Sequence, residues 1–161
     1  MLTAPALRVT RLTPAQLLAV RAVAHGATYA AGAEQLGITA ETFRSRLHKA
    51  SVALEVAPKS AHLVYVCCQQ GMLELPGPIP PLPSPGLNGP DARTLGLIAL
   101  GHNYASAARV LRVHSSAVQH RLRRAYQVLG ARNQPHAVYL GVGTGNVPLN
   151  LNGAHLMTGG R

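Results

Sequence analysis

The chain has 161 residues, of which 15 are lysine or arginine and 5 are aspartate or glutamate, so its formal net charge is +10. This length allows one medium domain or two small ones, and no apolar run in it is long enough to span a membrane. A charge so strongly positive predicts a polyanionic partner, of which nucleic acid is the simplest.

The first half of the chain carries the signals of four helices. Thr13 is placed to cap the first, with Pro14 at the first helical position and Gln16 where a capping box needs it. Gly26 is placed to end this helix. The four expected helices run from Pro14 to about Gly26, from Thr28 to near Leu36, from about Ala40 to Leu54, and from near Ser60 onward.

Two neighbouring cysteines, Cys67 and Cys68, lie in the fourth of these segments. Adjacent thiols cannot link distant parts of a fold, and no CxxC pair is present for zinc. The N-terminus also lacks the apolar region of a signal peptide. We therefore expect a reduced cytoplasmic protein without metal or disulfide, in which both cysteines are small apolar residues on a helix face.

A proline-rich stretch follows, with the sequence MLELPGPIPPLPSPGLNGP. Proline lacks the amide donor and fixes φ, so the stretch cannot form a helix or a central strand. Its composition predicts a semi-rigid spacer of the polyproline type, in which each residue adds about 3.1 Å.

The remainder of the chain repeats the first half. Shifting the sequence by 75 residues places Gly26 on Gly101 and Leu47 on Leu122. The shared positions are mostly apolar at helical spacing, which is the sign of a repeated fold. Asn88 is placed to cap the first helix of the second half, so the prediction is an all-α protein with two four-helix units. The other helices of this half are expected near 103–111, at 115–129 and from near 135.

These signals divide the chain into four segments. The expected boundaries are a first module at 1–71, a proline-rich linker at 72–86, a second module at 87–140 and a Gly-rich tail at 141–161. The tail contains GVGTG, but Val147 and Pro148 follow where a dinucleotide-binding motif needs a helix. We expect the tail to be loosely ordered.

The third helix of each half separates apolar from basic residues. In the first half Phe43, Leu47 and Ala50 recur at helical spacing and should face the core, which leaves Arg44 and His48 outside. In the second half Val118, Leu122 and Ala125 take the inner positions. A short helix, a tight turn and a helix with an outer basic face are typical of helix-turn-helix proteins, whose second helix enters the major groove of DNA.

The segment LTPAQLLAVRAVAHGATYAAGAEQLGITAETFRSRLHKASVAL resembles the helix-turn-helix of LuxR-type regulators and of region 4 of bacterial sigma factors. TFRSRLHKASVAL is closer to the sigma pattern, and VLGARNQPHAV is closer to the LuxR pattern. The resemblance covers about 12–70 and 87–140. It implies DNA contacts from Thr42, Arg44, Ser45, Arg46, His48, Lys49, Ser115, Ser116, Gln119, His120, Arg121, Arg123 and Arg124.

The second half departs from the first at three positions. Arg112 stands where Gly37 is in the first turn, so we expect a strained or differently shaped second turn. His114 replaces the capping residue Thr39, and we expect Ser115 to take over the cap. Ala117 replaces Thr42. The two halves are therefore expected to read different base sequences.

The expected function is sequence-specific binding of double-stranded DNA by a transcription regulator in the cytoplasm, associated with the nucleoid. An adaptor that binds RNA polymerase or an anti-sigma factor is one alternative, because region 4 of sigma factors makes such contacts. A DNA-binding protein of a mobile element, used in partition, packaging or recombination, is another. The acids are scattered and no HExxH or Gly-x-Ser-x-Gly motif is present, so we expect neither an enzyme nor a cofactor.

The fourth helix of the first half is apolar around much of its circumference. In LuxR-type proteins the corresponding helix makes the dimer contact. It can pack on the fourth helix of the second half, which would give an internal pseudo-twofold axis, or on a second chain. The glycines of 136–145 make that segment a poor partner, so we expect a homodimer through 60–70.

Overall fold

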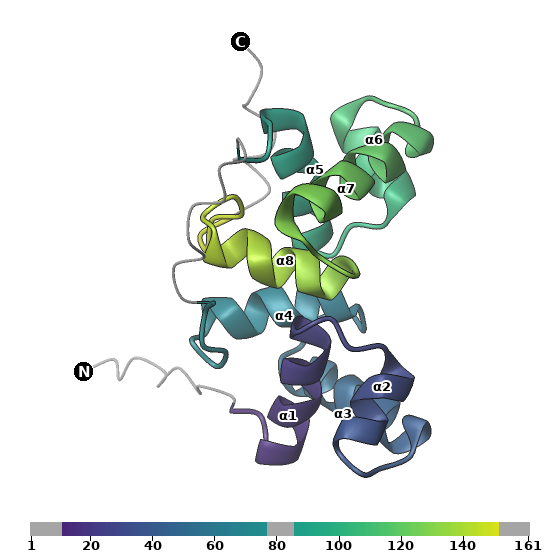
Figure 1. Ribbon diagram of the computed structural model, residues 1–161, viewed down its shortest axis with the longest axis vertical. Helices are drawn as coiled ribbons and strands as arrows, with labels where there is room; N and C mark the ends of the chain where they lie inside the picture. The colour runs from purple at the N-terminus through teal and green to yellow at the C-terminus, as the bar shows by residue number, and fades with distance from the viewer. Residues whose placement is uncertain (1–10, 77–85, 152–161) are drawn as a thin grey trace, which may run out of the picture.

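The computed structural model describes residues 11–76 and 86–151, and these residues form eight helices and no strand (Figure 1). The expectation of an all-α chain is confirmed for them. The first half, 11–76, contains α1 (Pro14–Ala24), α2 (Tyr29–Gln35), α3 (Ala40–Ala53) and α4 (Ser60–Gln69). The second half, 86–151, contains α5 (Gly89–Ala99), α6 (Tyr104–Leu111), α7 (Ser115–Leu129) and α8 (Gln134–Gly143).

The helices begin at the capping residues that the sequence marks. Thr13 Oγ1 accepts a hydrogen bond from the Gln16 amide at 3.2 Å, and Gln16 Oε1 accepts one from the Thr13 amide at 2.9 Å. This capping box satisfies two amides that the helix cannot pair itself. In the second half Asn88 Oδ1 accepts from the Asp91 amide at 2.8 Å. Helix α5 thus has the same kind of N-cap bond as α1, but not the return bond that completes the capping box of α1.

The turn between the second and third helices has the same shape in both halves. Gly37 has a φ of +63° and Arg112 a φ of +55°, which is the left-handed region that disfavours residues with a Cβ atom. The amide of Ile38 donates to the Ala33 carbonyl at 3.0 Å, and that of Val113 donates to the Ala108 carbonyl at 3.0 Å. The second turn is therefore not reshaped by Arg112, and the arginine adopts the glycine conformation.

The start of α7 differs from the prediction. His114 is its N-cap residue, but its side chain makes no capping hydrogen bond, and Ser115 is already the first helical residue. The expectation that Ser115 takes over the cap is therefore wrong. At the start of α3, Thr39 Oγ1 accepts from the Thr42 amide at 3.1 Å. One cap of the first half has thus been lost in the second.

The inward faces of α3 and α7 are the predicted ones. Phe43 and Ala50 on α3 are fully buried, and so are Val118 and Ala125 on α7. A Cβ atom built on Gly32 of α2 would come within 2.5 Å of the Phe43 ring. Because glycine leaves this space free, α2 can lie close against α3, and a short turn is enough to connect the two helices.

Helices α4 and α8 pack against each other in the middle of the molecule, with α1–α3 below them and α5–α7 above them in Figure 1. Most of α4 is buried, including Leu63, Val64 and Tyr65. The apolar face of 60–70, which we expected to meet a second chain, is thus covered by α8 of the same chain. Helix α8 pairs with it despite Gly141 and Gly143.

The described segment after α8 packs against α4. This part of the expected tail is therefore ordered, not loosely ordered as the sequence suggested. Val147 is 1% exposed. Tyr65 Oη donates to the Pro148 carbonyl at 2.6 Å and accepts from the Leu151 amide at 3.1 Å. Gln69 Nε2 donates to the Leu149 carbonyl at 2.8 Å. The N-terminal residues 1–10, the central part of the expected linker (77–85) and the rest of the expected tail (152–161) lie outside the described residues.

No helix in the two described ranges combines the length and the apolar character that crossing a membrane requires.

Candidate nucleic-acid interface

Helix α3 presents a basic face to solvent. Arg44, His48 and Lys49 are exposed, and so is Thr42 at the start of the helix. The guanidinium carbon of Arg44 lies 5.9 Å from the centre of the Tyr29 ring, at the start of α2. This cation–π contact directs the Arg44 side chain toward α2. The other two predicted contact residues on α3 are Ser45 and Arg46, and both are half-buried.

Helix α7 presents a corresponding face with different side chains. Its N-terminal turn exposes two serines, and its middle exposes Gln119 and Arg123. Glutamine can make a pair of hydrogen bonds with adenine, and arginine can do so with guanine. The predicted contact residues that are exposed on α7 are Ser115, Ser116, Gln119, His120 and Arg123, and Arg121 is half-buried.

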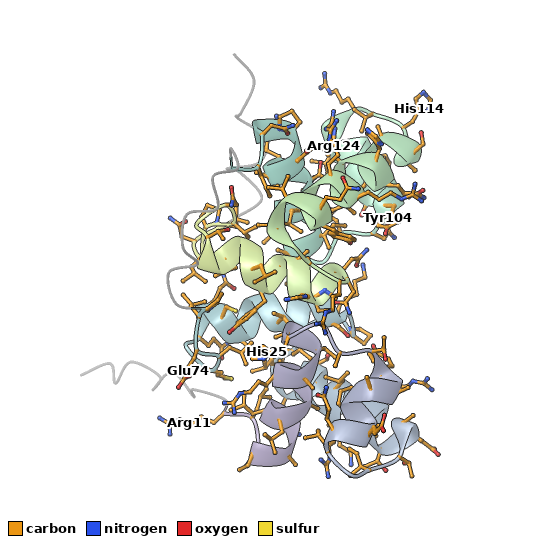
Figure 2. All side chains as sticks on the ribbon, viewed as in Figure 1. Arg11, His25, Glu74, Tyr104, His114 and Arg124 are labelled. Carbon is orange, nitrogen blue, oxygen red and sulfur yellow. The ribbon has the colours of Figure 1, made fainter. Side chains whose placement is uncertain are left out.

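Arg124, also on α7 and labelled in Figure 2, has a partly exposed side chain that pairs with Asp91 of α5. Its Nη2 donates to Asp91 Oδ1 at 2.6 Å and its Nε donates to Asp91 Oδ2 at 3.0 Å. The Asp91 side chain is 4% exposed. The paired carboxylate raises the pKa of Arg124. The ion pair therefore holds the Arg124 guanidinium against α5. Only its remaining N–H groups are left for a ligand.

The first half has no counterpart of this ion pair. Gln16 occupies the position that corresponds to Asp91, and it belongs to the cap of α1. The Arg124–Asp91 pair is the one ion pair found within residues 11–76 and 86–151. Lys49, which corresponds to Arg124, is exposed. The two basic faces therefore differ both in their side chains and in how firmly those side chains are held.

The two halves hold each other through reciprocal contacts. A Cβ atom built on Gly26, just after α1, would meet Nδ1 of His136 on α8 at 2.7 Å. A Cβ atom on Gly101, just after α5, would meet the ring of His62 on α4 at 3.3 Å. Each half thus places a histidine against the equivalent glycine of the other. Reciprocal contacts of this kind are those that a pseudo-twofold axis between the halves would produce.

Hydrogen bonds reinforce both of these contacts. Asn133 Nδ2 donates to the Gly26 carbonyl at 3.1 Å, and Lys59 Nζ donates to the Gly101 carbonyl. His62 Nδ1 is bonded to the Ala99 carbonyl at 2.8 Å. Because the bonded groups lie at helix ends, they satisfy carbonyls that the helices leave free. The relative position of the halves is therefore fixed by several polar contacts and by the α4–α8 core.

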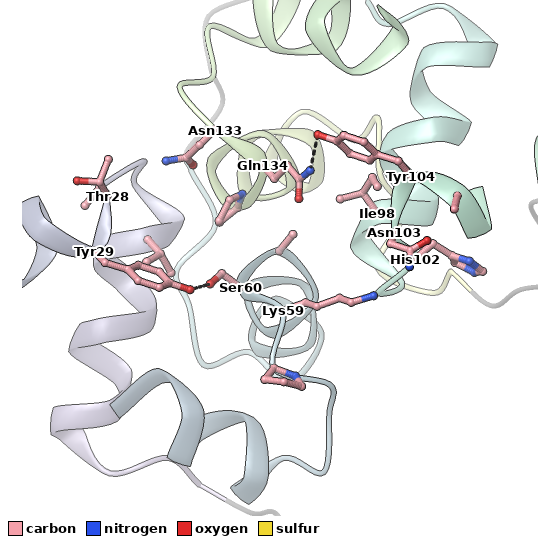
Figure 3. A pocket seen from close by; sticks show the side chains of 16 residues that line it. Thr28, Tyr29, Lys59, Ser60, Ile98, His102, Asn103, Tyr104, Asn133 and Gln134 are labelled. Atoms are coloured by element: carbon pink, nitrogen blue, oxygen red, sulfur yellow. Dashed lines mark hydrogen bonds between the residues drawn. The ribbon is translucent and has the colours of Figure 1, made fainter. Parts of the chain in front are cut away.

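A cleft opens between the halves beside the basic face of α3. It has a volume of about 820 Å³, and its lining includes Tyr29 and Ser60 from the first half and Tyr104 and Gln134 from the second (Figure 3). A smaller groove of about 240 Å³ shares Tyr29 and Ser60 with it and extends to Arg44. The sequence signalled neither, because each is lined by several helices that come together only in the folded chain.

The two cysteines are buried on α4. Burial raises the pKa of Cys67 to about 12, helped by the neighbouring Cys68, and burial raises the pKa of Cys68 to about 11. Both thiols therefore stay protonated at neutral pH, where they are poor nucleophiles. Their role in the described structure is to fill the core between α4 and its neighbours.

Comparisons with protein-family models, with curated protein sequences and with solved structures find no significant match to this chain. What the chain binds is therefore inferred from its own geometry.

Proposed function

We propose that this protein binds double-stranded DNA with α3 and α7 as the recognition helices of two helix-turn-helix units, and that it acts as a sequence-specific transcription regulator at the nucleoid. The observation that supports this most strongly is the pair of exposed basic helix faces joined in one body by α4 and α8. A second helix that follows a short helix and a tight turn, with its outer face free, suits the major groove.

The charge of the chain supports the same proposal. The formal net charge is +10, and the buried Asp91 is already paired with Arg124. Arg44, Lys49 and Arg123 are exposed on the two recognition faces. Arginine and lysine contacts with phosphates release counterions, so binding of this kind weakens steeply with salt.

The proposed DNA site has two unlike half-sites in inverted orientation. A pseudo-twofold axis relates the two halves, and a protein twofold axis matches inverted half-sites whose centres lie about one helical turn apart. Arg44 and His48 on α3 correspond to Gln119 and Arg123 on α7. Because these side chains pair with different base edges, the two half-sites should differ in sequence.

The proposal is tested by replacing one exposed arginine on each of two helices. Arg123→Ala should weaken binding to a selected duplex by about 1–3 kcal/mol, roughly fivefold to 150-fold, because a contact with a base or phosphate is lost. Arg21→Ala is the matched control, since Arg21 is exposed on α1 and lies outside the recognition faces. Fluorescence anisotropy at several salt concentrations measures both.

Equal losses for the two variants, or an affinity that stays constant between low and physiological salt, would contradict the proposal.

A further inference from the structure

We propose that the cleft between the two halves is a binding site for a small aromatic anion. The cleft has a volume of about 820 Å³, which lies within the range of pockets that enclose small organic ligands. Its walls come from both halves, so a bound molecule would contact each of them (Figure 3). None of the predicted DNA-contact residues of α3 and α7 lines the cleft, although Tyr29, which does line it, also lies against Arg44.

The floor of the cleft is apolar. Val23 of α1 and Ile98 of α5 line it. Both residues are almost fully buried, with exposed fractions of 1% and 3%. Ala27 and Ala105 line it nearby. Because the two alanines are small and partly or fully exposed, they leave room above the floor. Apolar atoms at the base of a pocket favour the hydrocarbon part of a ligand.

Two tyrosines lie on opposite walls at equivalent positions of the two halves. Tyr29 begins α2, and its hydroxyl is bonded to Ser60 Oγ at 3.0 Å. Tyr104 begins α6, and its hydroxyl accepts from Gln134 Nε2 at 3.0 Å. These bonds hold both rings in place before any ligand arrives, which lowers the entropy lost on binding. Aromatic walls favour a ligand with an aromatic ring.

The charge of the lining selects the sign of the ligand. Lys59 lines the cleft and extends from the start of α4 toward the connection between α5 and α6 (Figure 3). No aspartate or glutamate is among the residues that line it. Burial and the nearby Lys59 lower the pKa of His102, so Lys59 is the group that supplies positive charge at neutral pH. A carboxylate or sulfonate would meet it favourably.

Occupation of the cleft has a consequence that rests on the proposed function. Tyr29 and Tyr104 belong to the second helices of the two halves, each of which carries a recognition helix. A ligand in contact with both would add to the contacts that set the spacing of α3 and α7. The ligand would change the affinity for DNA only if it bound one spacing of these two helices more tightly than another. The change in DNA affinity would then be limited by the ratio of the ligand's two affinities.

The site is tested without DNA, using 8-anilinonaphthalene-1-sulfonate, whose fluorescence rises in apolar surroundings. The unchanged protein should bind it at one saturable site. Ala105→Trp fills the cleft and should weaken binding at least tenfold. Ala30→Trp is the matched control, because Ala30 is the equivalent exposed position on α2 and does not line the cleft. Circular dichroism confirms that each variant is folded.

The preference for an anion is tested with the chain's two lysines. Lys59→Ala should weaken binding of the sulfonate several-fold, and Lys49→Ala, on the exposed face of α3, should not. N-phenyl-1-naphthylamine, a neutral relative of the probe, should bind more weakly than the sulfonate to the unchanged protein. Equal binding by the two tryptophan variants would overturn the site, and equal affinity for the two probes would overturn its anion preference.

These outcomes do not depend on DNA. Probe binding that follows the cleft variants in a protein without DNA affinity would leave the ligand site standing and remove the proposed function. DNA binding that is lost in Lys59→Ala, together with no saturable probe binding, would mean that the cleft serves a DNA phosphate instead and would overturn the ligand site.

Discussion

Arg112 is held in a backbone conformation that suits glycine. Its φ is +55°, and the equivalent residue of the first half, Gly37, has a φ of +63°. The left-handed conformation costs a residue with a side chain about 1–2 kcal/mol. The surrounding helices impose it, because the Val113 amide must reach the Ala108 carbonyl for α7 to begin where it does. The turn is thus preserved in the second half, but the backbone conformation of Arg112 lowers the stability of the protein.

Replacing Arg112 with glycine should stabilise the protein. Arg112→Gly removes the unfavourable conformation but adds freedom to the unfolded chain, so we expect a gain of about 0.5–1 kcal/mol in the free energy of unfolding. The reverse change, Gly37→Ala, should lower it by a similar amount. A Cβ atom at Gly37 would meet nothing within 4 Å, so this loss would come from the backbone alone. Urea unfolding measures both.

A neutral or destabilising Arg112→Gly variant would show that the arginine side chain makes a compensating contact.

At the scale of the helices, the features that depend on local sequence were predictable. Caps such as Thr13 and Asn88 act within one turn, and their hydrogen bonds occur where the sequence places them. The inward positions of α3 and α7 followed from helical spacing, because a helix with one apolar face has one way to bury it. Phe43 and Leu122 are accordingly in the core.

The features that depend on distant contacts were not predictable. Gly141 and Gly143 looked like helix breakers, but they lie in α8 and face close neighbours. A Cβ atom on Gly141 would come within 2.8 Å of Val147, and one on Gly143 within 2.1 Å of Pro76. Glycine is weak in an isolated helix, yet here it admits packing that outweighs its low propensity. The internal α4–α8 pair follows from this.

The candidate site shows the same division. The exposed positions of Arg44, His48 and Gln119 followed from the helical period. The engagement of Arg124 did not, because it depends on Asp91 of α5, which the chain brings against α7 only after folding. Asp91 and Arg124 are 33 positions apart in the sequence, and no local pattern links them. The cleft between the halves was missed for the same reason.

At the scale of the molecule, the contact between the halves contains an acid-sensitive residue. Burial lowers the pKa of His136, and Arg132 and His25 nearby lower it further. Its Nδ1 accepts a hydrogen bond from the Arg132 amide at 3.2 Å, which a protonated nitrogen could not do. The folded protein therefore binds a proton at His136 less readily than the unfolded chain does.

Stability should consequently fall as the pH is lowered. Because the unfolded chain binds more protons below the ordinary histidine pKa of about 6.5, the free energy of unfolding decreases as the pH drops from there toward the lowered pKa. We expect the thermal midpoint to be lower at pH 5.5 than at pH 7.5. His136→Gln should reduce this dependence, and His120→Gln, at an exposed position of α7, should leave it unchanged. Calorimetry at several pH values measures it.

The same pH dependence in His136→Gln as in the unchanged protein would place the acid-sensitive group elsewhere.

The central claim, that one chain presents two unlike recognition helices about a pseudo-twofold axis, is tested most directly by selection from a random DNA library. The unchanged protein should enrich a site with two different half-sites about one helical turn apart. A second selection uses a variant in which four residues of α7 are replaced by their counterparts on α3. Its substitutions are Ala117→Thr, Gln119→Arg, His120→Ser and Arg123→His.

Because the pseudo-twofold axis relates the helices, this variant should enrich a palindrome in which the second half-site is an inverted copy of the first, with one chain bound per duplex. A direct repeat, an unchanged site or two chains per palindrome would contradict the account.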